Sequence, residues 1–321
     1  MWLRRTGSRR LSRRLKVGIA LVCVAVVGGT AAAGVQEALE PATFAPKIGG
    51  AAPGKGRAPA FTHVVVVFFE NKEYDSVIGS PSAPTFNSFA RRYALLTNSY
   101  AVTHPSLPNY LAFVSGSTQG ITDDCHDCVV DAPNLVDSLE KAGLGWKTYA
   151  EGLPSPGFTD YEAGKYVKKH NPFMYFKNVL DNRNRLARVV PYDQLATDLG
   201  RGKLPKFSLV IPDLCNDIHD CSVATGDTWL KGFLGQLVGN PLMKGGVIFI
   251  TFDEGKSDER GGGHISTIVV GSTVDRGVRS AQPVTHYSVL RTIEDAWGLP
   301  RLGASATAKP ITGIWLKTTA K

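Results

Sequence analysis

The chain has 321 residues, 43% of them hydrophobic and 20% charged, and its formal net charge at pH 7 is +8. Seven of the 36 basic residues lie before residue 34, where there is no acidic residue, so 29 basic and 28 acidic residues remain. A balance of +1 excludes a charge-based case for nucleic acid as a partner.

Residues 1–33 have the three-part layout of a secretory signal peptide. Basic residues precede an apolar run over 17–27, and Ala31 to Ala33 offer a cleavage site. The run is shorter than the roughly 20 residues of a membrane-spanning helix, although continued through residue 33 it would make an uncleaved anchor. Paired arginines at 9–10 and 13–14 hint at twin-arginine export. We expect a secreted or extracytoplasmic protein, exported by the Sec or Tat route.

Residues 34–60 are rich in Ala, Pro and Gly and lack periodicity, which is typical of a linker. Residues 61–321 are long enough for one α/β domain, and they contain no internal repeat.

Four cysteines follow the leader: Cys125, Cys128, Cys215 and Cys221. An even number in an exported chain suggests disulfides, and pairing within each close pair is the simplest arrangement. A structural zinc site is the alternative.

Continuous apolar runs rich in β-branched residues predict strands buried on both faces, as in a parallel sheet covered by helices. They span 62–70, 207–212, 246–252 and 264–270, with a weaker candidate at 146–150. Helical patterns lie at 134–143, 227–238 and 288–297. This alternation predicts an α/β/α sandwich with a mostly parallel central sheet.

Acidic residues follow three of these strands directly: Glu70 before Asn71, Asp213 after Pro212, and Asp253 before Glu254. In open α/β sheets the binding crevice lies at the carboxyl ends of the strands, so these side chains should converge.

Ser106 lies between two prolines just ahead of an apolar run, in the segment Thr103-His104-Pro105-Ser106-Leu107-Pro108. Such a serine can cap the helix, act as a nucleophile at the helix start, or do both, with Thr103 the rival nucleophile. His104 is a candidate to bind metal or to orient phosphate.

Carboxylates and histidines with a nearby hydroxyl are typical of a two-metal hydrolytic site. Asp213, Asn216, Asp217, His219 and Asp220 crowd one short segment, and His264 follows a run of three glycines. These donors predict one or two divalent metal ions: Zn, Mn or Fe for mixed ligands, Ca or Mg for mostly oxygen ligands. His126, His170 and His286 are interpreted as structural or surface residues.

The sequence resembles the bacterial phosphoesterase family that contains acid phosphatases and phospholipase C-type enzymes, within the alkaline phosphatase superfamily. The resemblance covers residues 64 to about 271 through five motifs in order. They are Glu70-Asn71-Lys72, Ser106-Leu-Pro-Asn-Tyr110 with Ser115-Gly116, Pro212-Asp213 with His219-Asp220, Thr251-Phe-Asp-Glu-Gly255, and Gly263-His264.

The resemblance implies one metal bound by Glu70, Asp253 and Glu254, with Ser106 adjacent. It implies a second metal at Asp213, His219 and His264, for which Asn216, Asp217 or Asp220 are alternative ligands because the spacing is longer than usual. Asn71 would bind a metal or a phosphate oxygen, and Ser106 would attack phosphorus.

We therefore expect an acid phosphatase-like, metal-dependent phosphoesterase that uses a serine phosphoenzyme. The alternatives are a phospholipase C-like diesterase and a non-catalytic exported protein that binds metal or phosphate. A sulfatase is disfavoured because no arginine follows Ser106 in the Ser-x-Pro-x-Arg pattern. The expected partner is a phosphate ester, with membrane contact only through an uncleaved leader or a lipid substrate, and the expected state is a monomer.

Overall fold

The computed structural model describes residues 57–316. They belong to one compact unit that spans Ala45–Lys321. The expected signal peptide and nearly all of the expected linker lie outside the described residues. Within 57–316, no helix combines the length and the apolar character that a membrane crossing requires.

An eight-stranded sheet forms the centre of this unit, in the order β10-β2-β9-β8-β1-β7-β3-β6. All neighbouring strands are parallel except that β9 runs antiparallel to both β8 and β2. The strands are β1 Val64–Phe69, β2 Ala94–Tyr100, β3 Trp146–Ala150, β6 Val189–Pro191, β7 Phe207–Ile211, β8 Val247–Phe252, β9 His264–Gly271 and β10 Arg279–Ser280. A separate small hairpin pairs β4 Glu162–Ala163 with β5 Tyr166–Val167.

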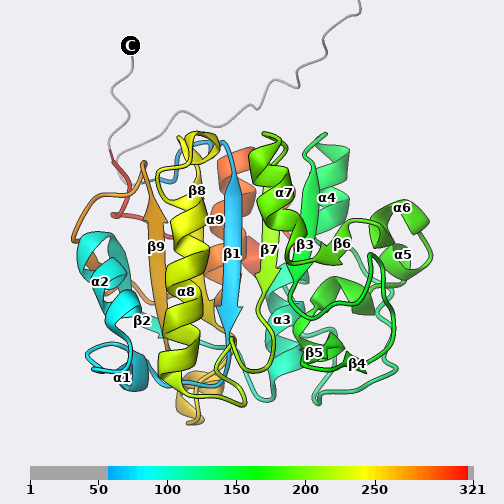
Figure 1. The fold of residues 1–321 in the computed structure, drawn as a ribbon, viewed down its shortest axis with the longest axis horizontal. Helices are drawn as coiled ribbons and strands as arrows, with labels where there is room; N and C mark the ends of the chain where they lie inside the picture. Colours follow the sequence, from blue (N-terminus) through cyan, green and yellow to red (C-terminus); the bar gives the residue numbers. More distant parts are fainter. Residues whose placement is uncertain (1–56, 317–321) are drawn as a thin grey trace, which may run out of the picture. The chain divides into compact units, whose positions relative to one another are not determined.

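Helices cover both faces of the sheet, with α8 in front of it, beside β1, and α9 behind it (Figure 1). One core contains side chains of α3, α4 and α9, and the other contains side chains of α2, α7 and α8. The helices are α1 Tyr74–Val77, α2 Pro84–Arg92, α3 Ser106–Ser115, α4 Leu135–Lys141, α5 Lys177–Leu180, α6 Arg183–Leu186, α7 Gln194–Gly200, α8 Val223–Leu237 and α9 His286–Trp297. The predicted α/β/α sandwich is confirmed.

Strand β1 shows why its sequence is apolar without interruption. Side chains alternate across a strand, so Val64, Val66 and Phe68 enter one core while Val65, Val67 and Phe69 enter the other. All six side chains are buried. The expected strand at 264–270 is also present, as β9, but it runs against its neighbours.

The three predicted helices are confirmed, with α8 and α9 beginning at Val223 and His286. At the start of α4, the side chain of Asn134 accepts the Val136 N–H at 3.0 Å. The two local disulfides, Cys125–Cys128 and Cys215–Cys221, are also present, so these sulfurs are not free to bind zinc.

Candidate active site

Strands β1 and β8 bring two acidic residues together at the carboxyl edge of the sheet. Phe69 is paired with Phe252, so Glu70 and Asp253 leave the sheet side by side. Both are fully buried. The backbone N–H of Asn71, at φ 50°, donates to Asp253 Oδ1 at 3.1 Å. Parallel register therefore builds the floor of the site.

Ser106 is the first residue of α3, and its hydroxyl points at this floor. Its Oγ donates to Glu70 Oε2 at 3.1 Å. Tyr110, one turn further along α3, donates its hydroxyl to Glu70 Oε1. The N-cap position belongs to Pro105, and Ser106 makes no capping bond. The interpretation of Ser106 as an N-cap is thus wrong in this structure.

His170 and Asp217 complete the cluster around Glu70. His170 Nε2 lies 3.3 Å from Glu70 Oε2, and its Nδ1 lies 3.1 Å from Asp217 Oδ2. One donor atom from each of the three residues lies within 4.8 Å of the others. All three side chains are buried. His170, interpreted from sequence as structural or surface, is instead at the centre, and Asp217, only an alternative ligand before, lies beside it.

The electrostatics of the cluster favour a bound cation. Burial, together with the neighbouring carboxylates of Asp253 and Asp217, raises the pKa of Glu70 well above its usual value. Burial likewise raises the pKa of Asp253 and that of Asp217. Burial lowers the pKa of His170 to about 3. A neutral imidazole among carboxylates is the form that binds metals.

Several polar atoms of this cluster are buried and lack a hydrogen-bond partner, which is costly unless a ligand satisfies them. They are Asn71 Oδ1 and Asp253 Oδ2, together with His170 Nε2 and Asp217 Oδ2, whose contacts of 3.3 and 3.1 Å inside the cluster do not have hydrogen-bond geometry. Among the ion pairs of residues 57–316, none joins a lysine or arginine to Glu70, Asp217 or Asp253. Oxygen and imidazole donors of this kind suit a divalent metal ion, so the residues present fit such a group.

A second pair, His104 and Glu254, comes from the segments that flank Ser106 and Asp253 in the sequence. His104 Nδ1 is 3.0 Å from Glu254 Oε2, and its Nε2 is 2.9 Å from the Ser257 carbonyl. The His104 side chain is 29% exposed, while Ser106 is only 1% exposed. Burial raises the pKa of Glu254 to about 9. This imidazole is therefore much more exposed to solvent than the buried serine.

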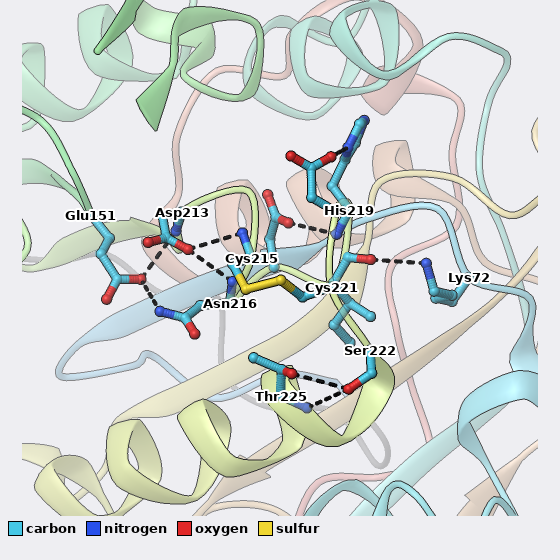
Figure 2. The surroundings of a disulfide bond; sticks show 12 residues. Lys72, Glu151, Asp213, Cys215, Asn216, His219, Cys221, Ser222 and Thr225 are labelled. Carbon is cyan, nitrogen blue, oxygen red and sulfur yellow. Dashed lines mark hydrogen bonds and ion pairs between the residues drawn. A yellow bond between two sulfur atoms is a disulfide. The ribbon is translucent and has the colours of Figure 1, made fainter. Parts of the chain in front are cut away.

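The segment after β7 is folded back on itself by its disulfide (Figure 2). Asp213 is not part of the group formed by Glu70, His170 and Asp217, and its Oδ1 accepts the N–H groups of Cys215 and Asn216, each at 2.9 Å. His219 Nδ1 lies 2.7 Å from Asp220 Oδ1, and the His219 ring centroid is 5.7 Å from that of His170. His219 and Asp220 thus border the site.

His264 also begins at the carboxyl edge, because β9 runs antiparallel to β8. Its ring stacks between Tyr74 and Tyr100, at centroid distances of 4.6 and 5.0 Å, and its Nε2 lies 3.1 Å from the Thr97 carbonyl. These contacts place the ring outside the group formed by Glu70, His170 and Asp217. The predicted metal-binding roles of Asp213, His219, Asp220 and His264 stay predictions.

The three glycines before His264 allow a close contact between two backbone segments. A Cβ at Gly262 would lie 2.5 Å from the Thr103 carbonyl oxygen, and one at Gly261 would lie 2.4 Å from that of Val102. Only glycine fits such an approach. The run therefore packs against the segment that leads into Ser106.

The fold and the site together define a class: an α/β sandwich of alkaline phosphatase-like architecture with a buried serine beside a cluster of carboxylates. Solved structures agree on the architecture. A protein of the alkaline phosphatase superfamily from Vibrio parahaemolyticus matches 80% of this chain and 71% of its own, with a TM-score of 0.57 at 11% identity. The phosphonate monoester hydrolase of Agrobacterium radiobacter gives a TM-score of 0.51 at 13% identity, covering 74% of each chain. At these identities the likeness concerns the fold alone.

The chain belongs to the Phosphoesterase family, whose model matches residues 80–300. It is 38% identical over 273 residues to a phosphatidylinositol-3-phosphatase of Mycobacterium tuberculosis, covering 83% of this chain and 88% of the relative. It is 33% identical to a probable acid phosphatase of Kluyveromyces lactis and 32% identical to an acid phosphatase of Aspergillus fumigatus. These alignments cover 81% and 76% of this chain, and 66% and 56% of the two relatives. The protein is a hydrolase that acts on phosphoric ester bonds.

Proposed function

We propose that this protein is an exported, metal-dependent phosphomonoesterase that transfers the phosphoryl group to Ser106 before hydrolysis. The observation that carries the proposal is the hydrogen bond of the Ser106 hydroxyl to Glu70, inside a cluster of buried carboxylates. Relatives named acid phosphatase and phosphatidylinositol-3-phosphatase favour a monoester over the diester of a phospholipase C.

Glu70, His170, Asp217 and Asp253 would hold the metal, with Asn71 beside them. Glu254, His219, Asp220, Asp213 and His264 remain proposed as further ligands or site residues. When bound, a divalent ion supplies positive charge that polarises the phosphoryl oxygens and favours ionisation of a serine hydroxyl.

The protein's own groups would orient the serine hydroxyl and offset the negative charge of the phosphoryl group. Ser106 Oγ would form the bond to phosphorus while the ester oxygen leaves. Glu70 fixes the direction of the serine hydroxyl, and Tyr110 fixes Glu70 in turn. The first N–H groups of α3 favour an anion at that end of the helix. His104 remains proposed as a site residue near the phosphoryl group, although its Nδ1 contacts Glu254 and its Nε2 contacts the Ser257 carbonyl, so it would have to release one of these partners to hydrogen-bond the substrate.

Export is supported by the layout of residues 1–33 and by the two disulfides, which persist in oxidising compartments. N-terminal sequencing of protein recovered outside the cytoplasm tests this point. A new N-terminus near residue 34 is the expected result, and an intact leader in the cytoplasmic fraction contradicts it.

The catalytic proposal is tested by hydrolysis of a matched monoester and diester with a common leaving group, in the presence of divalent metals. We expect faster turnover of the monoester and its loss in Ser106→Ala. A faster diester would assign the enzyme to the phospholipase C type. Turnover retained in a folded Ser106→Ala protein would refute the serine mechanism, and no turnover by the wild-type protein would indicate a binding protein.

A further inference from the structure

A carboxylate from a loop lies across the start of α3, next to the proposed nucleophile. Asp124, between α3 and α4, accepts the backbone N–H of Leu107 through Oδ1 at 2.9 Å. Its Oδ2 accepts the Lys169 ammonium at 2.9 Å. Both oxygens of this one carboxylate are thus held by donors that an anionic ligand would use.

These donors belong to the site by position. Leu107 directly follows Ser106, and Lys169 directly precedes His170. The Lys169 and Asp124 side chains are 15% and 24% exposed, so the pair lies between the buried cluster and solvent.

We call the Leu107 N–H and the Lys169 ammonium the cradle, and it is more than a helix N-terminus because it includes a charged side chain. In the buried cluster that includes His170, the residue after Lys169, His170 Nε2 and Asp253 Oδ2 form no hydrogen bond. A backbone N–H and an ammonium that together hold two oxygens match one edge of a phosphoryl group, and charge-assisted bonds of this kind are strong. The carboxylate of Asp124 has the shape and charge of that edge.

We propose that the Leu107 N–H and Lys169 bind two peripheral oxygens of a phosphomonoester dianion, one each, and that Asp124 occupies this place until substrate displaces it. The inference rests on the proposed function and adds a basis for substrate choice. A monoester dianion carries one more charged oxygen than a diester anion, so a cation at this position favours the monoester. Asp124 would compete with every phosphate ligand.

A purely structural ion pair makes a different prediction. If the pair only fixed the loop, removing either partner would impair phosphate binding in the same direction. In the proposed arrangement, the two removals have opposite effects, because one deletes a ligand of phosphate and the other deletes its competitor.

The experiment measures the inhibition constant of inorganic phosphate and the ratio of kcat/KM for monoester over diester, in the metal-loaded full chain. Lys169→Gln should weaken phosphate inhibition about tenfold to a hundredfold, the effect of losing one charged hydrogen bond, and should lower the ratio. Asp124→Asn should tighten phosphate inhibition by about threefold or more. Lys168→Gln is the matched control, since Lys168 Nζ lies over the Tyr175 ring, 4.9 Å from its centroid, and it should change neither quantity.

Weaker inhibition in both Lys169→Gln and Asp124→Asn, or no change in either, would overturn the inference. Its failure is distinguishable from that of the proposed function. Calorimetric titration of phosphate into the Ser106→Ala protein, with and without each second substitution, reports the cradle without turnover. Retained turnover in Ser106→Ala alone would refute the serine mechanism and leave the phosphate data to decide the cradle.

Discussion

Divalent metal should stabilise this protein, and replacement of Glu70 should remove that effect. Without a cation, Glu70, Asp217 and Asp253 bring three carboxyl groups into a buried space with unpartnered atoms. A ligand at 100 times its dissociation constant stabilises the folded state by about 2.7 kcal/mol. In a domain of this size, 1 kcal/mol moves the melting temperature by about 2–4 °C. The expected rise is therefore roughly 5–11 °C.

The assay is thermal unfolding of chelator-treated protein, titrated separately with Zn, Mn, Ca and Mg. Glu70→Gln should melt at about the same temperature as the wild type without metal, because glutamine keeps the size and polarity of a carboxyl group whose ionisation burial already disfavours. It should lose most of the metal response. Glu294→Gln is the matched control, since Glu294 is a buried glutamate of α9 whose carboxylate bonds to Leu302 N and Ser305 Oγ. No shift with any metal, or an equal shift in Glu70→Gln, would refute the reasoning.

Three further outcomes follow from particular contacts. His170→Ala should weaken metal affinity at least about tenfold, as a ligand or a ligand-orienting group would, and calorimetry that finds wild-type affinity would contradict its place in the cluster. Burial raises the pKa of Glu294 to about 7, above its ordinary value, so the stability of the wild-type protein falls as pH rises through 7. Urea unfolding should therefore show Glu294→Gln to be more stable than the wild type by about 2 kcal/mol at pH 8 and similar to it at pH 5. An equal difference at both pH values would refute this reasoning. Replacing both Cys215 and Cys221 with alanine should cost about 2 kcal/mol through loop entropy and lower turnover; unchanged turnover would show that the loop does not position the site.

The parts of the site that follow strands could be predicted because their signal is local. Continuous apolar runs identified β1 and β8. The residues that directly follow them lie close together because these two strands pair in parallel. Strand β2 gave no such signal, since Thr97 and Asn98 interrupt its apolar pattern and are only half-buried.

His170 could not be predicted, because it comes from a short 3₁₀ turn, Lys168–His170, that tertiary folding brings against Glu70. Asp217 stood among several acidic candidates in one segment, and only the loop conformation closed by Cys215–Cys221 selects it. His264 does begin at the expected edge, yet two tyrosines take both faces of its ring. Site residues at strand ends could be predicted from the sequence, whereas site residues in loops could not.

The central claim is that Ser106 carries the phosphoryl group. The most direct measurement is acid quenching of the metal-loaded enzyme during turnover of a labelled phosphomonoester, followed by peptide mapping. We predict a label on Ser106 and none in the Ser106→Ala protein. A label on Thr103, or turnover at the wild-type rate with Ser106 replaced, would contradict the account.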